Sequence, residues 1–144
     1  MRKWIRIAGF AALALAAMVF FSCGLFETPV SITERITTFV TSLNGDRSTT
    51  KDNLDTLIPA YAAVTAAWWE NPFAAADKTY TVDTTGLVTT DPTDVQVSIK
   101  GANGFNKLYK FSMVNTGTLA EVWVIHDLSV STGTSTWASI FTSL

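Results

Sequence analysis

Few side chains of this sequence are suited to acid–base chemistry, and the single histidine, His126, stands directly before Asp127. A histidine base needs a carboxylate within hydrogen-bond reach to orient it. Both residues fall in an alternating run typical of a β-strand, where neighbouring side chains point to opposite faces. The pair therefore does not predict a catalytic base. We interpret His126 as a residue at the edge of the core, in register with Val124 and Leu128, with a role in a binding pocket as the alternative.

Other chemistry-bearing patterns are missing from the sequence. One histidine, one cysteine and scattered acidic residues do not provide the clustered ligands that a metal site needs. The segment 101–107 contains Gly-Ala-Asn-Gly but lies between two expected strands, so no helix N-terminus follows it to receive a phosphate. We assign no catalytic residue and expect neither a metal nor another cofactor.

Cys23 is the only cysteine, and it ends a segment with the layout of an export signal. An apolar run over 7–21 is followed by Ser22 and then by the cysteine; the basic residues before the run are Arg2, Lys3 and Arg6. The run is shorter than the roughly 20 apolar residues that cross a bilayer core. The domain behind this signal is therefore expected to lie outside the cytoplasm.

Residues 20–23, Phe-Phe-Ser-Cys, resemble the lipobox of bacterial lipoproteins. In that family the cysteine is diacylated on its sulfur and becomes the first residue after cleavage. The resemblance implies lipid attachment at Cys23, a membrane partner through the lipid anchor, and a place in the bacterial cell envelope. The alternatives are an ordinary secretory signal cut after Gly24 and an uncleaved anchor.

We therefore divide the chain into a signal peptide over 1–22, a tether over 23–29 and a single α+β domain over 30–144. The whole chain carries ten basic and twelve acidic residues; loss of the three basic residues of the leader changes the formal net charge from −2 to −5. A domain that binds phosphate backbones needs a basic stripe. The lysines here are few and interspersed, so we expect no nucleic-acid partner.

A helix is expected over 31–43, because apolar residues recur there at the spacing of one helix face. Those residues are Ile32, Ile36, Phe39, Val40 and Leu43. Ser31 and Glu34 have the spacing of a capping box, and Asn44 with Gly45 provides a left-handed stop. A second helical stretch is expected over 52–58.

Another helix is expected over 59–69, because proline disfavours helix at the residue before it but suits a first turn. Trp68 and Trp69 are adjacent, and neighbours on a helix lie about 100° apart, so both indoles cannot face one core. We therefore expect Trp69 at the surface near Phe73, lining a ligand mouth, contacting a partner or resting on a membrane interface. The alternative is that Trp69 covers the end of the helical layer.

After residue 78 the period of the apolar residues changes to two, which predicts half-buried antiparallel strands at 80–83, 95–100 and 109–113. Asn103 and Gly104 predict a tight turn between the last two. A final strand over 119–130 is apolar on both sides, so we expect it to be central, with Trp123 buried. In the C-terminal segment helical spacing predicts docking against the domain through Trp137, Ile140, Phe141 and Leu144.

Helices followed by a meander of about four strands resemble the NTF2-like (cystatin-like) α+β group. The resemblance covers 30–130 and includes Leu43-Asn44-Gly45-Asp46, the segment 54–59 and the closing strand with Trp123-Val124-Ile125. It implies helices packed on a curved antiparallel sheet around a cone-shaped cavity. In enzymes of this group a cavity carboxylate serves as general base, and Asp83, Glu121 and Asp127 are the residues that could do so here. A plain sandwich of helices on a sheet is the alternative.

Three functions remain open at this point. The first is a membrane-anchored, non-enzymatic module that binds a small apolar ligand or an envelope protein through Trp69, Phe73 and His126. The second is an enzyme of the cystatin-like kind with an acid or a histidine in its cavity. The third is a structural protein of the envelope with neither pocket nor chemistry.

Overall fold

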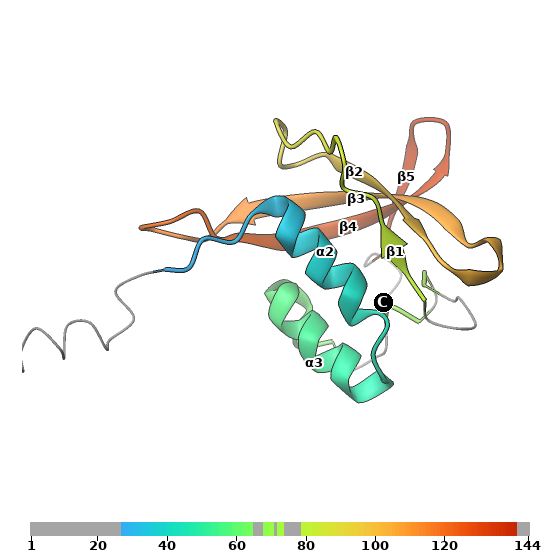
Figure 1. Cartoon of the computed structure of the whole chain (residues 1–144), viewed down its shortest axis with the longest axis horizontal. Coiled ribbons are helices and arrows are strands. Elements are labelled where there is room, and N and C mark those ends of the chain that lie inside the picture. The colour runs from blue at the N-terminus through green and yellow to red at the C-terminus, as the bar shows by residue number, and fades with distance from the viewer. Residues whose placement is uncertain (1–26, 65–67, 71, 74–78, 141–144) are drawn as a thin grey trace, which may run out of the picture.

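The computed structural model describes residues 27–64, 68–70, 72–73 and 79–140 (Figure 1). The leader, Cys23, Phe141 and Leu144 lie outside these residues. The described residues form an α+β fold with two α-helices, α2 (Ile32–Ser42) and α3 (Arg47–Leu57), and a five-stranded antiparallel sheet. The α+β class is confirmed, and the sheet has one strand more than the four expected.

The sheet is a meander in which each strand pairs with the next in the sequence. Its strands are β1 (Thr81–Val82), β2 (Val95–Lys100), β3 (Asn106–Asn115), β4 (Trp123–Gly133) and β5 (Thr136–Ser139). Short 3-10 turns occur at η1 (Pro59–Tyr61) and η2 (Ala102–Gly104). In the turn between β2 and β3, Asn103 and Gly104 both have positive φ, at 54° and 79°. The tight turn expected from this Asn-Gly pair is confirmed.

Helix α2 forms as its amphipathic pattern predicts. The Ser31 side chain accepts a hydrogen bond from the Glu34 backbone N–H at 3.1 Å, which caps the helix. Its apolar side turns toward the sheet: the Phe39 ring meets the Phe111 ring of β3 edge-on, with 5.4 Å between centroids. Helix α3 lies beside α2 (Figure 1) and buries Leu54 and Leu57. The core thus lies between the helices and one face of the sheet.

The helix expected over 59–69 does not form in the described part of that stretch. The 3-10 turn η1 ends at Tyr61, and the Val64 backbone N–H donates to the Tyr61 carbonyl at 2.9 Å in a turn. Two tyrosines bind carbonyls of the chain that follows this turn: Tyr109 of β3 donates from Oη to Pro72 O at 2.7 Å, and Tyr80, directly before β1, donates from Oη to Phe73 O. These tertiary contacts override a weak local helix preference.

A β-bulge in β4 changes which residues face the core. Ser112 pairs with Asp127 and Met113 pairs with Ile125, which leaves His126 as the extra residue. Ile125 and Leu128 are both buried, whereas His126 is exposed. The prediction that His126 follows the register of the buried Leu128 is therefore wrong, because the extra residue shifts the alternation of side chains by one.

Two further predictions, a buried Trp123 and a helical spacing in the C-terminal segment, are wrong. Trp123, expected to be buried, is half-buried at the first position of β4, and its Nε1 donates to Glu121 Oε2 at 3.3 Å. Residues 136–139 form strand β5, with Trp137 paired to Ser131, where helical spacing had been expected. Ile140 does dock: it is buried, and its N–H donates to the Leu128 carbonyl at 2.9 Å.

Candidate functional site

The three residues expected to form a binding site do not meet at one surface. Trp69 and Phe73 are both 5 % exposed and belong to the core, whereas His126 lies exposed on the sheet. The Trp68 and Trp69 rings pack edge-on, with 5.8 Å between centroids, and both are buried. The prediction that Trp69 lies at the surface is wrong, because the chain leaves helical geometry after Tyr61 and both indoles turn inward.

Phe73 is the centre of an aromatic cluster. Its ring stacks on Tyr109 at 4.8 Å between centroids, with 17° between the planes, and meets the rings of Phe39 and Tyr80 edge-on. Burial raises the pKa of Tyr109, so its hydroxyl stays protonated and donates to Pro72 O. We call Trp68, Trp69, Phe73, Tyr80 and Tyr109 the aromatic core. Its geometry is that of a structural core.

The three carboxylates suggested as general bases lie at different places in the fold and make different contacts. Asp83 is exposed after β1 and accepts the Thr85 N–H at 2.9 Å; Glu121 is exposed before β4. Asp127 sits at the bulge and accepts the Leu128 N–H at 2.8 Å. Burial and then the charge and hydrogen bond of Asp127 raise the pKa of Tyr61. Asp127 therefore supports the bulge and its contact with η1.

The loop between β1 and β2 surrounds an open hollow of about 460 Å³ that contains Asp83, Asp91 and Asp94. Asp91 accepts the backbone N–H of Thr93 at 2.9 Å, and Asp94 accepts from the Gln96 side chain at 2.9 Å. Asp91 thus closes a local turn, and Asp94 is bonded to a side chain two residues further along. Among the residues that the structure describes, no group of three His, Cys, Asp or Glu is placed to hold a metal ion.

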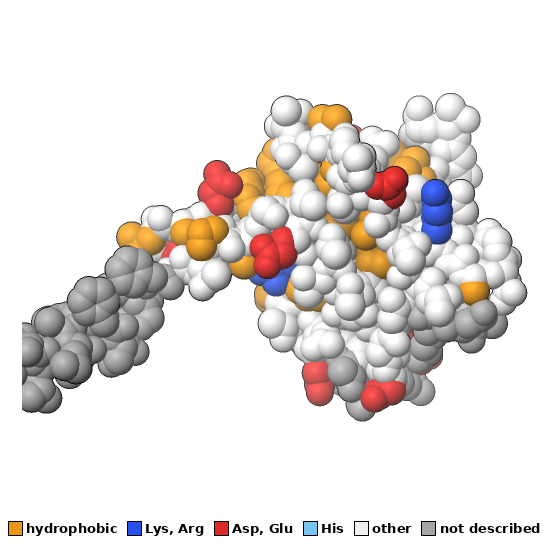
Figure 2. Space-filling model, in the orientation of Figure 1, with side chains coloured by type: hydrophobic (Ala, Val, Ile, Leu, Met, Phe, Trp, Pro, Cys, Tyr) orange, Lys and Arg blue, Asp and Glu red, His pale blue; other side chains and the backbone are white. Residues whose placement is uncertain are grey.

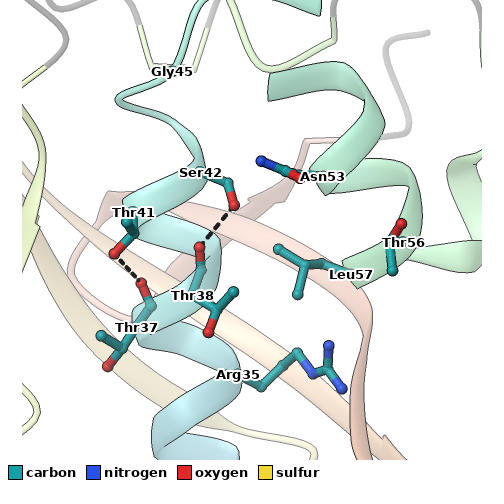
Figure 3. A pocket seen from close by; sticks show the side chains of 9 residues that line it. All are labelled: Arg35, Thr37, Thr38, Thr41, Ser42, Gly45, Asn53, Thr56 and Leu57. Atoms are coloured by element: carbon teal, nitrogen blue, oxygen red, sulfur yellow. Dashed lines mark hydrogen bonds between the residues drawn. The ribbon is translucent and has the colours of Figure 1, made fainter. Parts of the chain in front are cut away.

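A second open hollow, of about 530 Å³, lies between the two helices (Figure 3). It is lined by Arg35, Thr37, Thr38, Thr41, Ser42, Gly45, Asn53, Thr56 and Leu57. The Thr41 and Ser42 hydroxyls each donate to a carbonyl one turn earlier at 2.9 Å. Arg35 Nε donates to the Trp123 carbonyl at 2.7 Å, which fixes the start of its guanidinium group. Most of the exposed lining is carbon, and the hydroxyl, amide and guanidinium groups can orient a small bound molecule through hydrogen bonds. Sequence analysis missed it, although the threonines repeat on the polar side of α2.

The residues that follow the predicted cleavage site form a second arrangement that sequence analysis missed. Glu27 Oε2 accepts the backbone N–H groups of Thr118, Leu119 and Ala120 at 2.8, 2.9 and 3.1 Å, and Oε1 accepts the Thr118 hydroxyl at 2.9 Å. These bonds lower the pKa of Glu27 to about 2. We call this arrangement the Glu27 clasp. No local signal could reveal it, because its partners lie far along the chain.

Glycine and backbone pairing complete the clasp. A Cβ at Gly117 would lie 1.9 Å from the Ala120 carbonyl oxygen and 3.0 Å from Glu27 Oε2, so the loop closes only around glycine. Val30 forms a parallel bridge with Val122, its N–H donating to Glu121 O at 2.9 Å. The clasp thus joins 27–30 to the β3–β4 loop by both side-chain and backbone bonds.

None of the helices in the described residues combines the length and the apolar composition needed to cross a membrane. No protein-family model, curated protein or solved structure matches this chain.

Proposed function

We propose that this protein is a bacterial lipoprotein, anchored through Cys23 on the outer side of a membrane, whose domain is a non-enzymatic binding module. The observation that carries the proposal is the order of basic residues, apolar run, Ser22 and Cys23. The start of the described fold supports it, because Glu27 binds the domain only four positions after Cys23. The predicted cleavage therefore leaves the Glu27 clasp and every other described residue in the mature chain.

The hollow between α2 and α3 is the binding site that the geometry favours. Its exposed surface is mostly carbon, and the threonine, serine and asparagine side chains add a few polar groups, so it suits a small, mainly apolar ligand that carries one or two polar groups. We also propose that the domain belongs to the NTF2-like (cystatin-like) group; the order of helices before an antiparallel meander supports this proposal. No observation favours an enzyme, since the candidate bases lie at three separate places.

The anchor is tested by expressing Cys23→Ala in bacteria supplied with labelled palmitate. The variant is expected to lose all lipid label and to accumulate as a precursor or as unattached protein, because acylation and cleavage both need the sulfur. Ser22→Ala is the matched control, since it keeps a small residue before the cysteine and should retain the label. Membrane attachment and mature size in Cys23→Ala would contradict the proposal.

The hollow is tested by a thermal-shift screen with small amphipathic molecules, such as short-chain fatty acids and aromatic alcohols. Any compound that raises the melting temperature is tested again on Thr38→Leu, which fills the hollow, and on Thr134→Leu, an exposed control in the β4–β5 turn. Loss of the shift in the Thr38 variant alone is expected. An equal shift of the melting temperature in both variants would show that the compound binds elsewhere.

A further inference from the structure

The β3–β4 loop and the chain that enters the domain lie together at one end of the molecule (Figure 1). The Glu27 clasp and the Val30–Val122 bridge hold them there. Leu119 N–H is one of the groups bound by Glu27, so the Leu119 backbone lies 2.9 Å from this carboxylate. Any constraint on the position of Glu27 is therefore a constraint on the β3–β4 loop.

The length of chain from Cys23 supplies such a constraint. Three residues, Gly24, Leu25 and Phe26, separate the cysteine from Glu27. Even when fully extended, a step of four residues spans at most about 14 Å. The headgroup region on each side of a bilayer is roughly 5–8 Å thick. When the lipid of Cys23 lies in the bilayer, the short chain between Cys23 and Glu27 keeps the Glu27 clasp close to the membrane surface.

Apolar side chains gather at this same end. Large hydrophobic side chains exposed in the described part of the chain are Val88, Leu108, Val114 and Leu119, and the most exposed is Leu119, at 72 %. Val114 lies close to the loop on β3, and Figure 2 shows hydrophobic side chains where the entering chain meets the domain. The half-buried Trp123, with its Nε1 bonded to Glu121, is of the kind that rests at membrane interfaces.

The charged residues at this end of the domain indicate which kind of lipid surface it can contact. The stretch 114–123 contains no lysine or arginine, and its one acidic residue is Glu121. The clasped Glu27 adds a second negative charge, whose oxygens are occupied by backbone N–H groups. Arg35 is a basic side chain held beside this stretch, because its Nε donates to the Trp123 carbonyl at 2.7 Å, and the two carboxylates outnumber it. Anionic headgroups therefore gain no net attraction here, and contact must come from apolar burial.

We propose that the β3–β4 loop, residues 116–122, is the membrane-facing end of the domain, with Leu119 inserted at the headgroup level of the bilayer that holds the lipid of Cys23. The inference rests on the proposed lipid anchor. It adds an orientation: the hollow between α2 and α3 belongs to the same domain, and α2 packs against β4, so the clasp sets the position of the hollow above the membrane. The bilayer contact does not require anionic lipid.

A thiol scan tests this orientation. Acylation of Cys23 leaves no other thiol, so Leu119→Cys introduces a single labelling site, with Val88→Cys and Leu108→Cys as controls at other exposed apolar positions. Each full-length variant is expressed, purified in its processed form, labelled with a polarity-sensitive dye and reconstituted into phosphatidylcholine vesicles. The label at 119 is expected to shift to the blue and to be quenched by headgroup nitroxide lipids, whereas those at 88 and 108 are not. Adding phosphatidylglycerol should not increase the shift.

A second variant, which breaks the Glu27 clasp, tests whether the clasp holds the loop at the membrane. Glu27→Ala in the Leu119→Cys background is expected to reduce the blue shift and the quenching, because the loop is no longer held to the short tether. Asp52→Ala, which removes an exposed acid from α3 and leaves the loop intact, should leave both unchanged. Equal responses of the two variants would contradict the role of the clasp.

Outcomes for the anchor and for the orientation are distinct. Free reactivity of Cys23 in the wild type, or failure to float with vesicles, would overturn the lipid anchor itself. Normal flotation with a label at 119 as water-exposed as that at 88 would overturn the orientation alone. A blue shift at 119 that persists without vesicles and grows with protein concentration would indicate a second copy of the chain on this surface, and would also overturn it.

Discussion

The aromatic core and the Glu27 clasp hold chain segments in place by opposite means. The aromatic core buries five large rings, and hydroxyl groups at its edge bind the carbonyls of Pro72 and Phe73. The clasp is exposed and depends on one carboxylate that satisfies three backbone N–H groups. Burial of apolar area stabilises the whole fold, whereas the clasp positions one segment. The comparison separates residues needed for folding from residues free to meet a surface.

The largest effect is expected for Trp69→Ala. Removal of a buried indole leaves a cavity and should lower the free energy of unfolding by about 3–5 kcal/mol. Denaturant unfolding followed by circular dichroism measures it. A loss below about 1 kcal/mol would place this indole outside the core and reverse the comparison.

Tyr109→Phe is expected to have a smaller effect, since it keeps the stacked ring and removes only the hydroxyl. The Pro72 carbonyl loses its donor, which should cost about 1–3 kcal/mol. The same unfolding measurement applies, and Tyr61→Phe, which removes the hydroxyl bonded to Asp127, is a control outside the aromatic core. If Tyr109→Phe changed nothing, ring packing alone would account for the aromatic core.

Glu27→Gln should remove a pH dependence and leave the fold intact. The pKa of Glu27 falls from 4.5 to about 2 in the folded protein, so its contribution to stability is full above the unfolded value and is lost as pH decreases toward about 2. Melting temperatures recorded from about pH 5 down to about pH 2 should decline less steeply in the variant than in the wild type. Glu121→Gln is the control, and identical slopes in wild type and Glu27→Gln would mean that the clasp does not form in solution.

The smallest effect is expected for Leu119→Ser. The side chain is largely exposed, so the free energy of unfolding should change by no more than about 0.5 kcal/mol, although the proposed membrane contact weakens. The measurement combines denaturant unfolding with flotation of the processed protein. A large loss of stability would assign Leu119 to folding and remove the contrast with the aromatic core.

Local sequence patterns were sufficient to predict the elements whose signals lie within a few residues of each other. Helix α2 begins and ends within a residue of its predicted bounds, because its cap and its apolar stripe are contained in the helix itself. The β2–β3 hairpin follows from Asn103 and Gly104, which tolerate the positive φ that the turn requires. The segment that ends at Cys23 is likewise a local signal, and its function as an anchor is still a prediction.

Tertiary structure decided the positions where distant segments compete with local preference. His126 was assigned to the core edge, but a bulge opposite Ser112 and Met113 turns it outward. Both indoles of the Trp68–Trp69 pair are buried because the chain leaves helical geometry after Tyr61, and Tyr109 and Tyr80 bind the carbonyls of Pro72 and Phe73 just beyond them. Glu27 was assigned to a tether, but it binds N–H groups about 90 residues away. The sequence alone determined which segments can be helix, strand or export signal; register, burial and the clasp depend on pairings across the chain, whose energies no local pattern records.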